Sequence, residues 1–418
     1  MATRTAADDR GRQLAADFDL RNLDPAFVDN PFPTYRALLE HEPVKKFDDG
    51  SYLLSRYADL VTVYRDTKRY SSDKKIEFLP KFGDTPLYTH HTTSLVFNDP
   101  PLHTRVRSII VGALTPKAIA QMEPGLNRLV DDLIEAMAGK GRADLIEDFA
   151  AAIPIEIIGN LLAVPHADRG PLRGWSLAIL GALEPVLTQD QQDLGNRSVL
   201  EFQDYLDGLI AERRRKPGDP SVDVLTRLMQ GDGKEELTAV ELVQNCIFLL
   251  NAGHETTTNL IGNGLHVLTQ WPDERQRLLD DPGLIRTAIE EFLRFESSNQ
   301  LGNRITTEEV ELAGEVLPPR TQITLCIGAA NRDPAQFPDP DRLDVSRNPN
   351  KHLAFAWGPH LCAGLSLARL EGRIAIGKFL QRFPDYRIDG TPVRGGRVRF
   401  RGFTSLPVEL GAIRGQRQ

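Results

Sequence analysis

The sequence is poor in cysteine, with three in 418 residues: Cys246, Cys326 and Cys362. Cysteines this far apart cannot build a disulfide framework or a four-thiolate zinc or iron–sulfur site, which favours a reducing compartment. Long apolar runs are missing as well. No window reaches the roughly 18 apolar residues of a membrane helix, and residues 1–20 lack the apolar core of a signal peptide. We therefore expect a cytoplasmic protein that does not bind membranes.

Basic residues are not in excess either. Lys and Arg number 50 and Asp and Glu number 58, so the formal net charge is −8. This balance argues against nucleic-acid binding, because duplex affinity depends on phosphate neutralisation. Internal repeats and low-complexity linkers are also absent. We expect one domain over residues 1–418, with residues 1–20 as a flexible N-terminus.

Helical periodicity is the main pattern that is present, and strand-like runs are short, so the predicted class is mainly α with minor β. The clearest helix covers residues 239–271. It begins at a capping box, Thr238 with Glu241, and is about 50 Å long. Residues 71–101 and 166–197 show no clear helical period, and we expect irregular stretches that gate access to a site.

Cys362 lies between Gly358 and Gly364, in the segment FAWGPHLCAG that precedes an amphipathic helix. A sulfur near a helix N-terminus is stabilised as a thiolate, because the free N–H groups and the helix dipole lower its pKa. The glycines allow the backbone to come close to a flat partner. A lone cysteine is more often a buried structural residue, so its neighbours decide between the two interpretations.

Polar residues also interrupt the long helix, in the segment AGHETTTN over residues 252–259. Such a run is costly if the helix is buried. It could be an exposed polar turn or an interhelical hydrogen-bond cluster. A zinc protease motif H-E-x-x-H is excluded, because Thr258 stands where the second histidine is needed.

In this order the two segments resemble the cytochrome P-450 family. The family's cysteine loop reads F-G-x-G-x-H-x-C-x-G, and this chain departs from it with Ala356 at the second position. The resemblance implies that Cys362 is the axial ligand of the iron of haem b. It also implies a single P-450-type domain in which the haem is buried between a long distal helix and a proximal cysteine-loop helix. The loop residues implied to contact the cofactor are Phe355, Gly358, His360, Cys362 and Gly364.

The polar turn is similar to the family's A-G-x-D/E-T motif. The resemblance implies that Thr256 and Glu255 form the catalytic pair that handles protons at bound oxygen. It places Ala252 and Gly253 beside the cofactor, with Gly253 as the site of a kink.

Two further segments resemble the family. Glu291 and Arg294 match its structural E-x-x-R pair, with Arg342 as a candidate third partner. As isolated residues they would be interpreted as a solvated ion pair of small worth.

Four cationic or donor residues match positions that contact the haem propionates. His103 and Arg107 lie in a segment similar to D-P-P-x-H-x-x-x-R, and Arg304 and His360 match two other contacts. A buried carboxylate needs such partners. Taken alone, each residue is more often a surface charge.

The resemblance implies a monooxygenase that inserts one oxygen atom of O2 into an apolar or aromatic small molecule, by hydroxylation, epoxidation or O-dealkylation. Electrons would come from a separate ferredoxin or flavodoxin and an NAD(P)H-dependent reductase, docked on a basic face that includes Arg105, Arg369 and Arg373. We expect a monomer. The alternatives are a peroxide-driven peroxygenase and a non-catalytic haem sensor.

Substrate contacts are the least defined part of the site. Residues that could read a polar group are His90, His91, Asn251 and Gln300. The candidate substrate residues are Phe97, Phe248, Leu249, Ala252, Gln300, Leu301 and Phe403.

Overall fold

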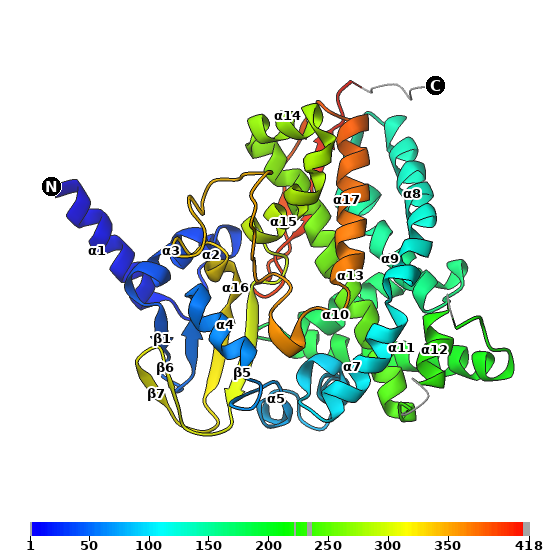
Figure 1. Cartoon of the computed structure of the whole chain (residues 1–418), viewed down its shortest axis with the longest axis horizontal. Coiled ribbons are helices and arrows are strands. Elements are labelled where there is room, and N and C mark those ends of the chain that lie inside the picture. Colours follow the sequence, from blue (N-terminus) through cyan, green and yellow to red (C-terminus); the bar gives the residue numbers. More distant parts are fainter. Residues whose placement is uncertain (1, 221–222, 232–235, 413–418) are drawn as a thin grey trace. The chain divides into compact units, whose positions relative to one another are not determined.

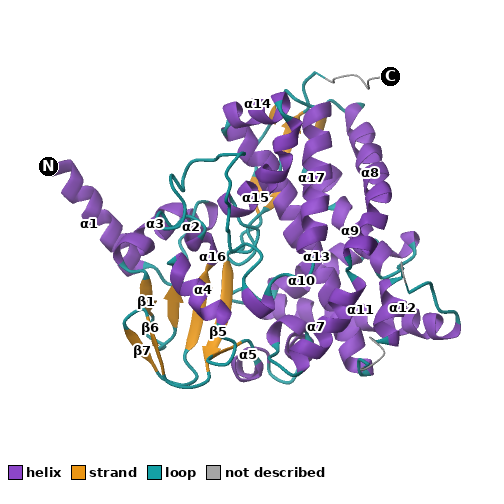
Figure 2. Cartoon of the chain, in the orientation of Figure 1, coloured by secondary structure: helices purple, strands orange, loops and turns teal. Residues whose placement is uncertain are grey.

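The computed structural model describes residues 2–220, 223–231 and 236–412. Helices dominate and the strands form small sheets (Figure 2), which confirms the mainly α class with minor β. Contacts divide the chain into two compact units. Unit 1 holds Met1–Ser72, Gln276–Cys362 and Arg394–Gly402, and unit 2 holds Asp73–Arg275, Ala363–Val393 and Phe403–Gln418. The single domain over residues 1–418 stays a prediction.

Unit 1 is built around a five-stranded sheet in the order β1-β2-β8-β5-β3 (Figure 1). Strand β2 pairs with β8 in parallel and the other neighbours are antiparallel. Side chains such as Leu54 and Leu325, both 0% exposed, belong to a core on this sheet. The elements within unit 1 are α1 (Ala2–Asp17), α2 (Pro25–Asp29), α3 (Phe32–His41), β1 (Val44–Lys46), β2 (Tyr52–Leu54), α4 (Tyr57–Arg65), β3 (Tyr70–Ser71), α15 (Ile285–Phe295), β5 (Leu301–Thr306), β6 (Val310–Leu312), β7 (Glu315–Leu317), β8 (Gln322–Cys326) and α16 (Ile327–Ala330).

Most of the N-terminal segment is helix α1, and the flexibility expected of residues 1–20 stays a prediction. Ala15 is 1% exposed and packs into a second core of unit 1. The buried Lys45 ammonium donates hydrogen bonds to the carbonyls of Ala15 and Ala16 at 2.8 Å and 3.0 Å. A cation at the carbonyl end of a helix is favourable, so the end of α1 is anchored.

Unit 2 is a helical assembly in which α13 contacts α6, α9, α10, α11 and α17. Helices α17 and α8 run side by side (Figure 1). Its elements are α5 (Lys75–Phe82), α6 (Pro86–Thr93), α7 (Leu102–Ala113), α8 (Pro116–Ala138), β4 (Arg142–Asp144), α9 (Ala152–Leu161), α10 (Leu172–Gly181), α11 (Gln189–Arg215), α12 (Val224–Gln230), α13 (Ala239–Gln270), α17 (Leu365–Arg382), β9 (Arg387–Ile388), β11 (Phe403–Ser405) and β12 (Pro407–Glu409). Helix α14 (Pro272–Asp280) and strand β10 (Val393–Arg394) each include residues of both units.

Helix α13 forms as its sequence predicts. The Thr238 hydroxyl accepts a hydrogen bond from the Glu241 N–H at 3.2 Å, and the Glu241 carboxylate accepts one from the Thr238 N–H at 2.9 Å. This capping box satisfies two of the donors that a helix start leaves open. The helix then runs for 32 residues, about 48 Å, to Gln270.

The two stretches expected to be irregular contain helices. Residues 71–101 include α5 and α6, and residues 166–197 include α10 and the start of α11. Helix α6 has a recognisable start, because the Thr85 hydroxyl accepts from the Tyr88 N–H and Pro86 occupies the first turn. Helices this short gain most of their stability from packing against other elements, which a periodicity pattern does not record.

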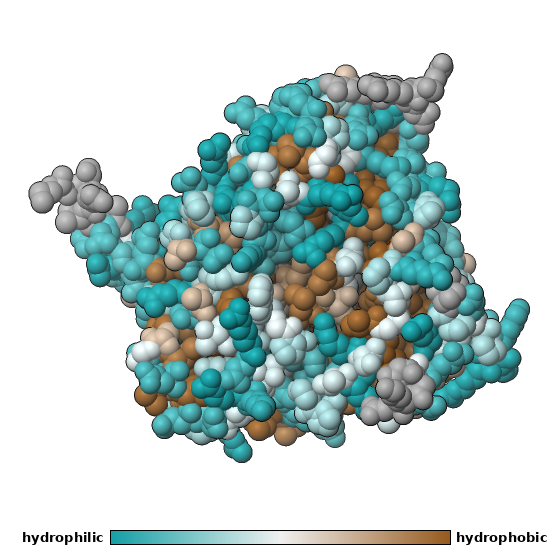
Figure 3. Space-filling model, viewed as in Figure 1, coloured by the Kyte–Doolittle hydropathy of each residue, from teal (hydrophilic) through white to brown (hydrophobic). Residues whose placement is uncertain are grey.

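Hydrophilic side chains cover most of the face seen in Figure 3, with smaller hydrophobic patches between them. None of the helices in the described part of the chain combines the length and the hydropathy needed to cross a bilayer.

Candidate functional site

The cysteine loop lies in unit 1 and leads directly into α17. Cys362 is partly exposed and comes two residues before Gly364, the N-cap of that helix. Its N–H donates to the Phe355 carbonyl at 3.0 Å, which closes the loop. The sulfur therefore stands at the start of an 18-residue helix, the setting that stabilises a thiolate.

Two residues of this loop have left-handed backbones. Gly358 has φ +69°, and a Cβ there would lie 2.5 Å from the Tyr64 carbonyl oxygen, so only glycine fits. Ala356, which replaces the glycine of the family pattern, has φ +59°. A side chain in this conformation costs about 1 kcal/mol, so the departure from the family pattern is a strained position.

The other two cysteines are unsuited to hold a metal. Cys246 and Cys326 are 0% and 1% exposed, and burial raises the pKa of each thiol to about 12. Both remain protonated near neutral pH. Among the described residues there is also no group of three or more His, Cys, Asp and Glu side chains that could hold a metal ion.

Helix α13 in unit 2 carries an accessible stripe on one face. Between residues 241 and 265 every residue is buried except five, and the successive spacings of these five are one or three positions, so they share one helix face. We call these five residues the α13 stripe: Phe248, Leu249, Ala252, Gly253 and Thr256. Four of its residues are apolar or lack a side chain, and the fifth, Thr256, places a hydroxyl group at its C-terminal end.

The predicted catalytic pair, Thr256 and Glu255, lies at the C-terminal end of this stripe, with Thr256 in the stripe and Glu255 next to it. The Thr256 hydroxyl donates to the Ala252 carbonyl at 2.8 Å, and Glu255 beside it is 6% exposed. Gly253 has a packing role, because a Cβ there would meet the Ile158 side chain of α9 at 2.6 Å. The expected kink at Gly253 stays a prediction, since α13 continues through this position as regular helix.

The four residues predicted to face carboxylates are divided between the units. In unit 2, His103 and Arg107 are one turn apart on α7, and His103 is 3% exposed. In unit 1, Arg304 on β5 is 7% exposed with its guanidinium 5.1 Å from the Tyr64 ring, and His360 is 9% exposed in the cysteine loop. Buried donors of this kind suit an anionic ligand.

Glu291 and Arg294 belong to a buried ion-pair network in unit 1, and its third side chain is not the predicted Arg342. Glu291 and Arg294 have side chains 0% exposed and share two hydrogen bonds of 2.8 Å. The third partner is Arg347, whose Nε lies 3.2 Å and 3.1 Å from the two Glu291 oxygens. Arg342 was expected there, but its side chain is exposed and only its backbone carbonyl accepts from Arg294, at 3.3 Å.

Two predicted substrate residues are buried within unit 1. Gln300 is 1% exposed, accepts a hydrogen bond from the Tyr35 hydroxyl and donates to the Ser297 carbonyl, so its amide is used inside unit 1. Leu301 is 2% exposed and belongs to a core cluster of the same unit. Both side chains are used in internal contacts of unit 1, and their contact with a substrate stays a prediction.

Two other aromatic candidates are also packed within unit 2. The Phe97 ring lies 5.2 Å from that of Phe78, and Phe97 keeps partial exposure. Phe403 is 6% exposed, with its ring 4.6 Å from that of His266.

Sequence reasoning missed Ser298 and Asn299. Among the described residues, Ser298 Oγ and Asn299 Oδ1 are buried without a hydrogen-bond partner. The signal was a polar run, SSN, directly before a buried strand. Both atoms need a partner such as water or a ligand.

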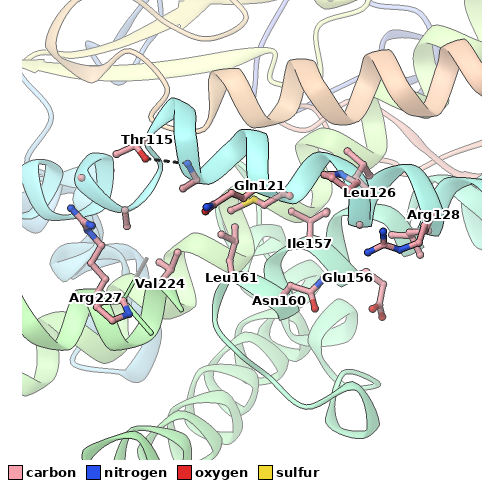
Figure 4. Close-up of a pocket in the computed structure, with 18 of the residues that line it drawn as sticks. Thr115, Gln121, Leu126, Arg128, Glu156, Ile157, Asn160, Leu161, Val224 and Arg227 are labelled. Atoms are coloured by element: carbon pink, nitrogen blue, oxygen red, sulfur yellow. Dashed lines mark hydrogen bonds between the residues drawn. The ribbon is translucent and has the colours of Figure 1, made fainter. Parts of the chain in front are cut away.

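Unit 2 also contains a pocket of about 520 Å³, which is lined by residues outside the α13 stripe (Figure 4). Helices α7, α8, α9 and α12 line it, with Gln121, Ile157 and Arg227 among its residues. None of the predicted site residues is part of this lining. Its polar side chains, such as Thr115, Asp132 and Glu156, belong to none of the motifs in the sequence, so the cysteine loop of unit 1 and the α13 stripe of unit 2 remain the candidate features.

Comparisons with known proteins show the family of this chain. Residues 177–386 match the family model described as cytochrome P-450. The vitamin D(3) 25-hydroxylase of Pseudonocardia autotrophica is 36% identical over 394 residues, which cover 92% of this chain and 95% of that protein. The biotin biosynthesis cytochrome P-450 of Bacillus subtilis is 35% identical over 393 residues, covering 91% and 96%.

A solved structure is similar over the same extent. The crystal structure of P-450BioI in complex with an acyl carrier protein ligated to hexadec-9Z-enoic acid has a TM-score of 0.87 and 32% identity, covering 92% of this chain and 99% of that chain. This chain belongs to the cytochrome P-450 family and is a haem-thiolate monooxygenase. Proteins of this family use haem, O2, a small-molecule substrate and redox partners.

The residues present fit a haem. In unit 1 an accessible cysteine precedes a helix, and the buried Arg304 and His360 suit a carboxylate. In unit 2 the α13 stripe presents accessible apolar side chains that suit a flat macrocycle, and the buried His103 is a further donor.

Proposed function

We propose that the Cys362 thiolate would hold the iron of haem b and that the α13 stripe would line the part of the site where the substrate binds. The observation that carries the proposal is the contrast among the cysteines, since Cys362 alone is accessible and stands before a helix N-terminus. Phe355, Gly358 and Gly364 would shape the loop under the cofactor. His103, Arg107, Arg304 and His360 would hold the propionates as charge-assisted partners.

When bound, haem with a thiolate ligand supplies the activation of O2. The chain's own part is proton handling and orientation. Thr256 holds its proton toward the Ala252 carbonyl, so its oxygen is free to accept a hydrogen bond from water or a ligand. Glu255 next to it would replenish protons from its buried position. Phe248 and Leu249 exclude water and orient an apolar substrate.

The substrate class follows from this apolar stripe. We propose an apolar or aromatic small molecule, oxidised by hydroxylation, epoxidation or O-dealkylation. The names of relatives, such as a vitamin D(3) 25-hydroxylase, support an apolar compound. We propose further that the enzyme acts as a cytoplasmic monomer.

For electron supply we propose a separate ferredoxin or flavodoxin with an NAD(P)H-dependent reductase. Arg105 is a weaker docking candidate than its sequence implies, because its guanidinium forms an ion pair with Glu241 and also donates to the Glu236 carbonyl at 2.9 Å. Arg369 and Arg373, both partly exposed on α17, are the better candidates. Electron transfer that is insensitive to ionic strength would contradict such a basic docking face.

The experiment is turnover of a library of apolar compounds that shift the Soret band. One arm supplies ferredoxin, reductase and NAD(P)H, and the other supplies hydrogen peroxide. We expect oxygenated product in the first arm, with one atom labelled from ¹⁸O2. Product in the peroxide arm alone would establish the peroxygenase alternative, and the absence of any Soret shift or product would favour a haem sensor.

A further inference from the structure

The pocket of unit 2 in Figure 4 has no part in the proposed function. Its volume of about 520 Å³ is that of an ordinary small-molecule site. Helix α8 contributes lining residues from Ala118 to Asp132, which are about 21 Å apart along the helix axis. A small molecule with an extended body therefore matches the pocket better than a compact one.

The apolar part of the lining is aliphatic. No aromatic ring is found among the described residues that line the pocket, so the faces that favour ring stacking are missing. An aliphatic wall gains free energy from any hydrocarbon that it removes from water. The larger apolar side chains come from α8, α9 and α12 and are Met122, Leu126, Leu129, Ile157, Leu161 and Val224.

The two ends of the pocket differ in charge. Figure 4 shows Arg227 at one end and Arg128 with Glu156 at the other. At the second end the charges are mixed, because Glu156 forms an ion pair with Arg169 and Asp132 follows Arg128 by one turn of α8. At the first end Arg227 is the only charged residue of the lining.

The Arg227 guanidinium is not neutralised by a neighbour. It forms no hydrogen bond or ion pair within the described part of the chain, and its side chain is half-buried. It lies against the last turn of α7, where a Cβ on Gly112 would be 3.4 Å from Nη2. Asp223, at the start of α12, does not serve it, because that carboxylate accepts from Arg213 Nε at 2.8 Å. A free guanidinium beside an apolar wall suits a carboxylate, which it can bind through two N–H groups.

Helix α9 connects this pocket to the α13 stripe. Ile157 lines the pocket, and the next residue, Ile158, packs against the stripe, with its Cδ1 2.6 Å from the position of a Cβ on Gly253. A molecule held between α8 and α9 therefore contacts a helix that also supports the stripe.

We propose that this pocket binds an aliphatic carboxylate, with the carboxylate on Arg227 and the hydrocarbon chain against α8 and α9, and that this ligand is an effector of the α13 stripe. The binding site goes beyond the proposed function and does not depend on it. The effector role rests on the proposed function, since it changes the affinity of a ligand bound at the stripe.

The binding test uses the haem-loaded enzyme with its haem site filled by 4-phenylimidazole, so that a second site is observed alone. Octanoate, octan-1-ol and octyltrimethylammonium share one chain length and differ in charge, and each is titrated by calorimetry. We expect octanoate to bind at least about tenfold more tightly than octan-1-ol, as charge-assisted hydrogen bonds require. The cation should bind more weakly than the alcohol.

The variants separate recognition from folding. Arg227→Gln should weaken octanoate to the affinity of octan-1-ol and leave the alcohol unchanged, and Arg227→Lys should retain part of the preference. Arg128→Gln, at the other end of the pocket, is the matched control and should keep the wild-type ratio. Ala118→Trp fills the pocket without changing its charge and should abolish binding of both compounds. A purely structural role of Arg227 would lower the unfolding temperature and leave the ratio as it is.

The effector role is tested by the Soret titration of 4-phenylimidazole with and without saturating octanoate. We expect the midpoint to change at least about fivefold in the wild type and by less in Arg227→Gln. Octanoate that competes at the haem site itself would change the midpoint equally in both proteins, and that result would overturn the effector role.

Three results would overturn the binding site: no octanoate binding to the blocked enzyme, equal affinity for octanoate and octan-1-ol, or an unchanged preference in Arg227→Gln. The haem ligand has its own test in the carbon-monoxide spectrum. Failure of the proposed function and failure of the Arg227 site are therefore distinguishable.

Discussion

Arg347 Nε lies 3.2 Å from Glu291 Oε1 and 3.1 Å from Glu291 Oε2, where the Glu291 carboxylate is 0% exposed and the Arg347 side chain 11% exposed. Arg294 occupies the other side of the same carboxylate and also donates to the carbonyls of Asn331 and Pro340. The three side chains therefore hold helix α15 to the irregular segment that leads toward the cysteine loop.

Arg347→Met should destabilise the protein by about 3 kcal/mol, because it removes one of the cations that face a buried carboxylate. Arg342→Met is the matched control and should change stability by less than about 0.5 kcal/mol, since its exposed side chain lies outside the network. Urea denaturation followed by circular dichroism measures both. Equal losses in the two variants would contradict the assignment of Arg347.

Cys362→Ala should abolish the absorption band at about 450 nm of the reduced carbon-monoxide complex, because that band depends on thiolate ligation. Cys246→Ala and Cys326→Ala are the controls. Their thiols are buried and protonated, so the band should persist at the same position. A band that survives in Cys362→Ala would disprove the ligand assignment.

Thr256→Ala should uncouple the enzyme, so that reducing equivalents are still consumed while peroxide rises and product falls severalfold. Thr256→Ser keeps the hydroxyl and should restore most of the coupling. Thr258→Ala is a control, since that hydroxyl is buried and donates to the His254 carbonyl at 3.0 Å. The ratio of product to NAD(P)H consumed is the measurement, and an unchanged ratio in Thr256→Ala would remove Thr256 from the proton path.

Ala356→Gly should stabilise the haem-loaded enzyme by up to about 1 kcal/mol, because glycine adopts φ +59° without strain. Gly358→Ala should do the opposite and weaken haem retention, since a methyl group there would collide with the Tyr64 carbonyl. Thermal unfolding and haem transfer to apomyoglobin report the two effects. A destabilised Ala356→Gly variant would show that the loop conformation in solution is different.

Because Glu371 on α17 is a buried carboxyl group, we expect the free energy of unfolding to depend on pH. Glu371 is 2% exposed, its Oε2 lacks a hydrogen-bond partner among the described residues, and burial raises its pKa from 4.5 to about 8. Below pH 4.5 both states are protonated. Between pH 4.5 and 8 the unfolded chain ionises this group while the folded protein does not, so its contribution to stability is lost as the pH rises.

Glu371→Gln keeps the size and shape of the side chain but has no ionisable group. The variant should therefore lose less stability than the wild type as the pH rises. We expect the wild type to lose about 3 kcal/mol more than the variant between roughly pH 5 and pH 8. Urea denaturation at a series of pH values measures the difference. Parallel curves for the two proteins would show that Glu371 ionises normally in the folded state.

The elements that the sequence predicts well are those whose cause is local. The start of α13 follows from Thr238 and Glu241 three residues apart, and the structure has both capping hydrogen bonds. The cysteine loop likewise follows from the spacing of its glycines, histidine and cysteine within ten residues.

The errors concern contacts between distant segments. Arg342 and Arg347 are equivalent candidates by sequence, and only the path of the intervening chain decides which side chain reaches Glu291. Gln300 and Leu301 lie at a strand start, where the pairing of Leu301 with Cys326 determines which face is buried.

The close approach of Ile158 to Gly253 limits how this enzyme can be engineered. Positions 248, 249 and 252 present accessible side chains, so a library at these three codons would reshape the binding surface without repacking the interior. A replacement at 253 would collide with the end of the Ile158 side chain, which would have to shift or be shortened at the same time. The pair 158 and 253 should therefore be varied together, as a single unit, in directed evolution of the substrate range.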